Sequence, residues 1–295
     1  MPLVEILQRF TAWCSGGKVG SRSANVQRSI LRIASARFAS YTKRQTAVIV
    51  CIVASLAYQS FPASAAPSAT EIVERAENIL WGQTLTADYE MTITTPTWSR
   101  TLMLQVRMDR PEKKSFVRIT APAKDAGIAS LRIASEMWNY IPSIERTVKI
   151  PPSMMLQPWL GSDFTNDDLV KESSILNDYT HRVISEKEID GNDAYQIEVI
   201  PKPNAAVVWG KIIYSIRKND FVPLKEEFYD ERGELIRVLI YSNFRAMGGR
   251  TIPTQWEMQP LNKVGKRTTV IVKSASYDKP ISADIFSLRN LNKKD

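Results

Sequence analysis

The first periodic segment of the chain predicts an amphipathic helix. Residues 68–82, SATEIVERAENILWG, carry apolar side chains at helical spacing. The apolar face comprises Ile72, Val73, Ala76, Ile79 and Leu80. Ser68 followed three residues later by Glu71 is a capping-box pattern, and Gly82 is suited to end the helix.

After this helix the period falls to about two residues, which is typical of β-strands. Residues 101–108, TLMLQVRM, alternate, with Leu102, Leu104, Val106 and Met108 on one face. Because the opposite face carries Arg107, we expect Leu102, Leu104 and Val106 to face the interior. Roughly twelve short strands follow this pattern, joined mostly by tight turns such as those near residues 190–192 and 231–233. They predict an antiparallel, meandering sheet, and a sheet of this size tends to curl or close.

Residues 150–169, IPPSMMLQPWLGSDFTNDDL, interrupt the strands, and we call them the flap. A proline pair ends the preceding strand, and a helix over SMMLQPWLG would break at Pro158. A second short helix is better supported, because Thr165 can cap it with Asp168 at the capping-box position. The pattern predicts a mainly β fold with an N-terminal helix and an inserted helical flap, in one domain over residues 66–295; two small sheets packed together are the alternative.

Two sequence features indicate a cavity. Residues 235–241, LIRVLIY, are apolar on both faces apart from Arg237, so the second face is either covered or lines a hollow. The flap carries bulky apolar side chains at Met154, Met155, Leu156, Trp159, Leu160 and Phe164. Methionine is common on adaptable apolar surfaces. The flap side chains could form a lid over a cavity, or they could plug the end of a barrel as ordinary core.

The positive charge is concentrated in the first 65 residues. The chain has a net charge of +8, but residues 1–65 hold eight basic residues against one acid, Glu5. The remainder is close to neutral, so we set nucleic acid aside as a partner. Lys43 and Arg44 precede a short apolar run and the small-residue site ASA, which together resemble a secretory signal peptide. We expect cleavage near Ala65 and export across an inner membrane.

The leader has three alternative interpretations. The acid-free run at residues 21–41 resembles an organelle transit peptide. An uncleaved anchor is disfavoured because the apolar run is far shorter than the roughly 20 residues that span a bilayer. A lipoprotein acylated at Cys51 is disfavoured because Val50 precedes the cysteine. Both cysteines, Cys14 and Cys51, lie in the leader, so the mature chain has no disulfide.

Candidate catalytic motifs are weak. His181, the only histidine, lies in a strand pattern, and LGSDF lacks the second glycine of a G-x-S-x-G elbow. The flap aspartates lack EF-hand spacing, and helix capping explains at least two of them; they are Asp163, Asp167 and Asp168. Glu226 and Glu227 point to opposite faces of a strand, so they cannot act as a pair. We expect a binding protein with no catalytic residues, metal or cofactor.

A long motif spans residues 138–169: W-x-Y-x-P, then arginine, then I-P-P-S-M-M, then G-S-D-F-T-N-D-D-L. Its members are Trp138, Tyr140, Pro142, Arg146, residues 150–155 and residues 161–169. With this motif, the chain resembles the outer-membrane lipoprotein-sorting proteins of the LolA-like superfamily over nearly all of residues 68–290. One departure is Pro158, where the family has an apolar or small polar residue before the tryptophan.

The resemblance implies a half-open antiparallel β-barrel closed by helices, with an apolar cavity for acyl chains and a periplasmic location. Members of this branch often accompany inner-membrane RND-type lipid exporters. We expect a monomeric carrier that moves the acyl chains of a lipoprotein or a free lipid toward the outer membrane. The expected lipid-binding residues are Leu102, Leu104, Val106, Trp138, Tyr140, Met154, Met155, Leu156, Trp159, Leu160 and Phe164. The alternative is a periplasmic sensor of the same fold that contacts a membrane regulator.

Overall fold

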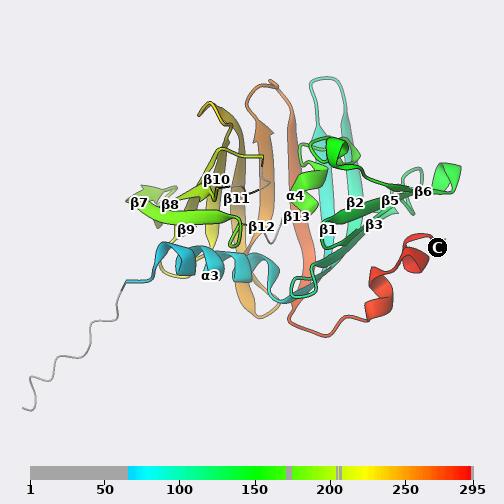
Figure 1. The fold of residues 1–295 in the computed structure, drawn as a ribbon, viewed down its shortest axis with the longest axis horizontal. Helices are drawn as coiled ribbons and strands as arrows, with labels where there is room; N and C mark the ends of the chain where they lie inside the picture. Colours follow the sequence, from blue (N-terminus) through cyan, green and yellow to red (C-terminus); the bar gives the residue numbers. More distant parts are fainter. Residues whose placement is uncertain (1–65, 171–174, 204, 206–207, 294–295) are drawn as a thin grey trace, which may run out of the picture. The chain divides into compact units, whose positions relative to one another are not determined.

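The structure is a computed structural model that describes residues 66–170, 175–203, 205 and 208–293 (Figure 1). The chain divides into two units, residues 1–66 and residues 67–295, and all the helices and strands of the described residues lie in the second. The predicted signal peptide lies outside the described residues and stays a prediction. No helix in the described part of the chain is both long enough and apolar enough to span a membrane.

The predicted N-terminal helix is confirmed as α3 (Ala69–Trp81). The side chain of Ser68 accepts a hydrogen bond from the backbone N–H of Glu71, as a capping box requires. The helix ends at Gly82, whose N–H donates to the carbonyl of Asn78. The predicted apolar face is buried, apart from Ile79, which is half-buried against the same core. This face contacts strands β7, β9 and β12, defined below, so the helix lies across the C-terminal part of the sheet.

All thirteen strands of the described residues form one sheet, close to the expected twelve. They are β1 (Thr84–Thr94), β2 (Ser99–Asp109), β3 (Lys114–Ala121), β4 (Ala129–Ile133), β5 (Glu136–Ile141), β6 (Arg146–Lys149), β7 (Tyr179–Ile189), β8 (Asn192–Pro201), β9 (Lys211–Arg217), β10 (Pro223–Tyr229), β11 (Leu235–Met247), β12 (Arg250–Pro260) and β13 (Arg267–Tyr277). The order is β6-β5-β4-β3-β2-β1-β13-β12-β11-β10-β9-β8-β7, and every neighbouring pair is antiparallel.

The sheet consists of two meanders joined by one long-range pairing. Strands β1 to β6 follow one another in space, as do β7 to β13, and β1 pairs with β13. Strands β6 and β7 are the edges of the sheet and do not pair with each other, so the barrel is half-open, as the family resemblance implied. The two hairpin turns are also confirmed. Asp190 and Gly191 both have positive φ between β7 and β8, the geometry that a tight two-residue hairpin needs. The turn near residues 231–233 joins β10 to β11, which pair antiparallel.

Alternation along the strands separates two faces of the N-terminal meander. On one face Leu102, Leu104 and Val106 are buried in the main core, as expected. The opposite face of β3, β4 and β5 is covered by the C-terminal turns η4 (Ala283–Phe286) and α5 (Leu288–Leu291). The guanidinium of Arg118 on β3 fixes this segment by donating to the carbonyls of Asn290 and Lys293 at 2.6 and 2.7 Å. Sequence reasoning did not anticipate this C-terminal cover.

The flap is less helical than predicted. It contains two 3-10 turns, η2 (Pro152–Met154) and η3 (Trp159–Gly161), in place of one helix broken at Pro158. The second predicted helix is present as α4 (Asn166–Val170). Its capping box is confirmed, because the N–H of Asp168 donates to the Thr165 hydroxyl and the N–H of Thr165 donates to the Asp168 carboxylate.

Candidate functional site

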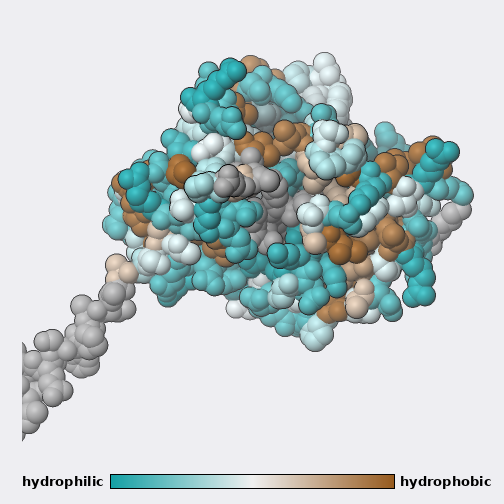
Figure 2. Space-filling view, in the orientation of Figure 1, coloured by the Kyte–Doolittle hydropathy of each residue, from teal (hydrophilic) through white to brown (hydrophobic). Residues whose placement is uncertain are grey.

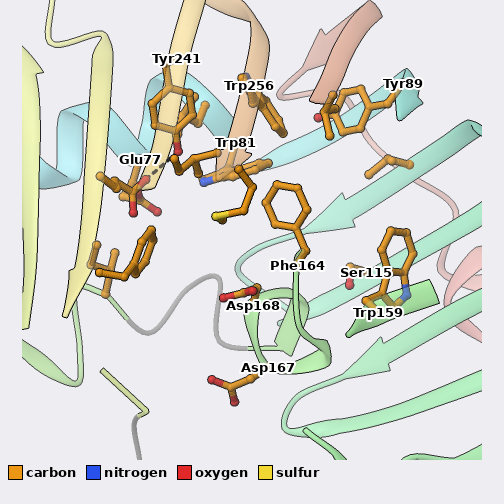
Figure 3. Close-up of a pocket in the computed structure, with 18 of the residues that line it drawn as sticks. Glu77, Trp81, Tyr89, Ser115, Trp159, Phe164, Asp167, Asp168, Tyr241 and Trp256 are labelled. Carbon is orange, nitrogen blue, oxygen red and sulfur yellow. Dashed lines mark hydrogen bonds between the residues drawn. The ribbon is translucent and has the colours of Figure 1, made fainter. Parts of the chain in front are cut away.

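A cavity of about 220 Å³ lies between the sheet, helix α3 and the flap. Its lining is mostly apolar and includes Met91, Leu104, Val106, Ile212, Phe228 and Val270. The indole of Trp256 lies near the centre of an aromatic wall and meets three rings edge-on, those of Trp81, Tyr89 and Tyr241, at centroid distances of 5.4, 5.3 and 6.3 Å. Figure 3 shows the side chain of Phe164 from the flap lying among these rings. The cavity can therefore surround an apolar chain on several sides.

Four of the expected lipid-binding residues line this cavity: Leu104, Val106, Trp159 and Phe164. Leu102 is fully buried in the same core but is not part of the lining. Met155 and Leu160 are half-buried and pack against that core. Whether any of them contacts lipid stays a prediction.

The other four expected residues lie elsewhere. Met154 and Leu156 are 46% and 55% exposed on the outside of the flap. Trp138 and Tyr140 on β5 belong to the small cluster under the C-terminal segment, because alternation along the strand turns them away from Met137, which faces the main core. Figure 2 shows apolar side chains at the surface in the region of β5 and β6.

Polar contacts hold the flap against the sheet at three places. The indole N–H of Trp159 donates to the hydroxyl of Ser130 on β4 at 3.0 Å. The carboxylate of Asp163 accepts a hydrogen bond from Thr268 on β13 at 2.7 Å, and the ammonium of Lys266 lies 3.3 Å from it. The third contact joins the flap to β11. Sequence reasoning assigned the flap aspartates to helix capping and missed these hydrogen bonds and ion pairs with the sheet.

That third contact is an ion pair between Asp168 and Arg237. The guanidinium of Arg237 donates to both carboxylate oxygens, at 2.8 and 2.5 Å. The same guanidinium is stacked between the rings of Trp209 and Phe228, at 4.4 and 4.5 Å from their centroids. Burial alone would raise the pKa of Asp168, but the charge and hydrogen bonds of Arg237 outweigh it and lower the pKa. The ion pair between the buried Arg237 guanidinium and Asp168 thus holds the flap against β11, over the cavity.

A second polar group, which we call the acid–tyrosine cluster, consists of Glu77, Tyr214, Glu226 and Tyr241. The hydroxyl of Tyr241 donates to Glu226 at 2.6 Å, and that of Tyr214 donates to Glu77 at 3.3 Å. Tyr214 and Glu226 face each other across β9 and β10. Burial raises the pKa of Glu226 to about 7, although the hydrogen bond from Tyr241 opposes the shift.

The strand pattern contained a signal for Glu226. In β10, PLKEEFY, alternation places Leu224, Glu226 and Phe228 on one face, and all three are buried. The expectation that Glu226 and Glu227 point apart is met, since Glu227 instead pairs with Lys225 at 2.8 Å on the other face. An acid on the inward face of an apolar strand is a signal for a buried polar group, and sequence reasoning missed it.

The described residues offer little catalytic chemistry. His181 is half-buried, and its ring nitrogens lie 3.1 Å from the Thr70 hydroxyl and 2.9 Å from the Ile175 carbonyl. Burial lowers the pKa of His181. Within the described range, no three His, Cys, Asp or Glu side chains are grouped as a metal ion would need. The arrangement can enclose an apolar chain and offer hydrogen-bond acceptors to its end.

Comparison with known proteins identifies a matching family model and solved structures with a similar fold. A family model described only as "Uncharacterized protein" matches residues 111–293, which is more than half of the chain. A DUF1329 family protein from Desulfovibrio piger has a TM-score of 0.68 at 20% identity, covering 76% of this chain and 97% of its own. A LolA superfamily protein from Nitrosomonas europaea has a TM-score of 0.65 at 24% identity, covering 76% of this chain and all of its own.

An outer membrane lipoprotein-sorting protein domain from Vibrio parahaemolyticus is equally similar in structure, with a TM-score of 0.65 at 22% identity, covering 76% of this chain and 98% of its own. At these identities the similarity establishes the fold alone. No curated protein sequence matches the chain. The chain belongs to the family of uncharacterized proteins whose model it matches, and its half-open sheet with helical cover is the fold of the LolA-like superfamily.

Proposed function

We propose that the protein is a periplasmic carrier that holds the acyl chains of a lipid or lipoprotein in its cavity and moves them toward the outer membrane. The observation that carries this proposal is the mostly apolar cavity lining contributed jointly by α3, the sheet and the flap. A mainly apolar cavity with a few polar groups is the usual form of a small-molecule binding site. The LolA-like fold supports the same class of function.

Energetics favour an enclosed carrier for such a cargo. An acyl chain of about 16 carbons gains roughly 0.8 kcal/mol per buried CH₂, or about 12 kcal/mol in total. Free lipid therefore crosses water slowly, and a carrier must offer comparable apolar surface. It must also release the cargo, which a small flap fastened by polar contacts permits. Breaking a few hydrogen bonds costs less than unfolding a core.

The location and partner belong to the same proposal. The leader pattern from Lys43 to Ala65 supports export, and we propose that the mature chain begins near Ala66 and works in the periplasm as a monomer. Resemblance to carriers that accompany inner-membrane RND-type exporters supports a partner of that kind. Such an exporter would load the cavity from the inner-membrane side.

The test is native mass spectrometry of the protein isolated from the periplasmic fraction of its own cell. The expected spectrum shows a chain that starts near Ala66 and carries acyl-containing molecules at near-stoichiometric occupancy. The matched comparison is Leu104→Glu, which places a carboxylate in the cavity wall, against Gln105→Glu on the exposed face of the same strand. Absence of bound lipid from both the parent and Gln105→Glu would refute the carrier.

A further inference from the structure

The cavity is apolar except for a group of acids. Glu77, Asp167, Asp168 and Glu226 contribute carboxyl groups to its lining. Arg237 is the one basic side chain among the described residues of the lining, and it is already paired with Asp168. The lining therefore carries an excess of acidic groups. Figure 3 shows Glu77 and Tyr241 on the opposite side of the cavity from Trp159, so the acid–tyrosine cluster lies apart from this part of the flap.

Glu226 is the acid best placed to meet a ligand. Its side chain lines the cavity although the residue is only 8% exposed. One oxygen, Oε1, accepts the hydrogen bond from Tyr241. The other oxygen, Oε2, is not among the fully buried atoms that lack a partner, since Nε of Arg237 is the only such atom in the described residues. A carboxyl oxygen that is accessible from the cavity can accept a further hydrogen bond from a donor on a ligand.

The charge of the lining decides which donors fit. A ligand that ends in a carboxylate or phosphate would bring a further negative charge next to Glu226 in apolar surroundings, which is strongly unfavourable. A hydroxyl or amine end would instead donate to Glu226 and complete its hydrogen bonding. Burial raises the pKa of Glu226 to about 7, so near neutral pH the group is present both as carboxylate and as carboxylic acid. Both forms accept a hydrogen bond.

We propose that the cavity selects lipids whose inserted end is a non-anionic hydrogen-bond donor, a hydroxyl or an amine, and that Glu226 receives this donor. The inference rests on the proposed function, because it takes the cavity to hold an alkyl chain. It goes further by fixing the chemistry of the end group. Lipids with a buried free acid or phosphate are excluded.

The test compares three probes with the same chain and different ends: dodecan-1-ol, dodecylamine and dodecanoate. Each is titrated into the full chain, below its micelle concentration and at about pH 8, where the acid and Glu226 are ionised and the amine is largely protonated. Calorimetry or displacement of a fluorescent alkyl reporter gives the affinities. The alcohol and the amine should bind about tenfold or more tighter than dodecanoate.

Substitution then assigns the preference to one residue. Glu226→Gln removes the charge while keeping the shape, so the affinity for dodecanoate should rise and that for dodecylamine should fall. Glu227→Gln is the matched control, since Glu227 is the next residue on the same strand and points to the other face. Circular dichroism shows that both variants keep the fold before binding is compared.

The outcomes distinguish the proposed end-group preference from the proposed carrier function. Equal affinity for the three probes, or tightest binding of dodecanoate, would overturn the inference and leave the carrier standing. An end-group preference that survives Glu226→Gln would remove Glu226 from the role proposed for it. Failure of all three probes to bind would overturn the carrier function and the inference together.

Discussion

Arg237 on β11 and Asp168 on the flap form a two-pronged ion pair inside the wall of the cavity, where the Arg237 side chain is only 5% exposed. The pair connects the strand that the sequence marked as apolar on both faces with the segment that covers the cavity. Removing one partner leaves the other charge buried, which typically costs about 3–5 kcal/mol.

This contact gives the first prediction. Arg237→Met should lower the free energy of unfolding by about 3 kcal/mol, and Arg237→Met combined with Asp168→Asn should lower it less, because no unpaired charge remains. Urea unfolding followed by circular dichroism measures both. The control is Lys149→Met at the exposed pair with Glu136, where the loss should stay below about 1 kcal/mol. Equal losses for Arg237→Met and Lys149→Met would show that the buried pair does not hold the flap.

The second prediction concerns pH. Burial raises the pKa of Glu226 in the folded protein to about 7, whereas an unfolded glutamate titrates near 4.5. Between these values the folded state binds a proton that the unfolded state has released, so stability falls as pH rises through this window, by up to about 3 kcal/mol. Glu226→Gln should remove this part of the pH dependence. Urea unfolding of parent and variant at about pH 5 and about pH 8 measures how much the free energy of unfolding of each changes with pH. Equal changes in the two proteins would contradict the prediction.

The third prediction concerns the flap as a cover. Trp159 is buried, lines the cavity and is held by Ser130, so a bound acyl chain should lie close to its indole. Titration with a lipid brominated along its chain should quench tryptophan fluorescence. Trp159→Phe should reduce the quenched amplitude, whereas Trp98→Phe, a substitution at a half-exposed tryptophan outside the lining, should not. Because Trp81, Trp209 and Trp256 also line the cavity, an unchanged amplitude in Trp159→Phe would mean that the cargo does not lie beside Trp159.

The fourth prediction concerns the facing of β2. Leu104 is 4% exposed and lines the cavity, while Gln105 beside it is exposed. Leu104→Glu should lower stability by several kcal/mol or abolish acyl binding, because the new carboxylate would be buried among apolar groups. Gln105→Glu should alter stability by less than about 0.5 kcal/mol. Thermal unfolding together with the binding titration compares the two. Normal stability and binding in Leu104→Glu would be incompatible with the described cavity.

Features that follow from local periodicity were predictable from the sequence. The cap at Ser68, the inward face of β2 and the hairpin at Asp190 each depend on residues only a few positions apart. The antiparallel, meandering sheet followed from the number of strands and their short connections, whereas its half-open form was implied only by the family resemblance. Residues near in sequence set these features, so the pattern along the chain was sufficient.

Long-range contacts were not predictable in this way. The pairing of Arg237 with Asp168 and that of Tyr241 with Glu226 depend on strand register and on where the flap returns to the sheet. The position of Trp138 was missed for the same reason: its strand has apolar residues on both faces, and the C-terminal segment that covers one of them comes more than a hundred residues later. A sequence pattern shows that a face is buried, but not which segment buries it.

The pairing of β1 with β13 has a consequence for how the molecule is made. Thr94 lies opposite Arg267, so the centre of the sheet is formed by the first and the last strand of the described residues. Contacts this distant in sequence form slowly, because a long loop must close before they stabilise anything. A growing chain therefore has no finished cavity until synthesis reaches its final strand. A product that stops short of β13 lacks the strand that joins the two meanders into one sheet.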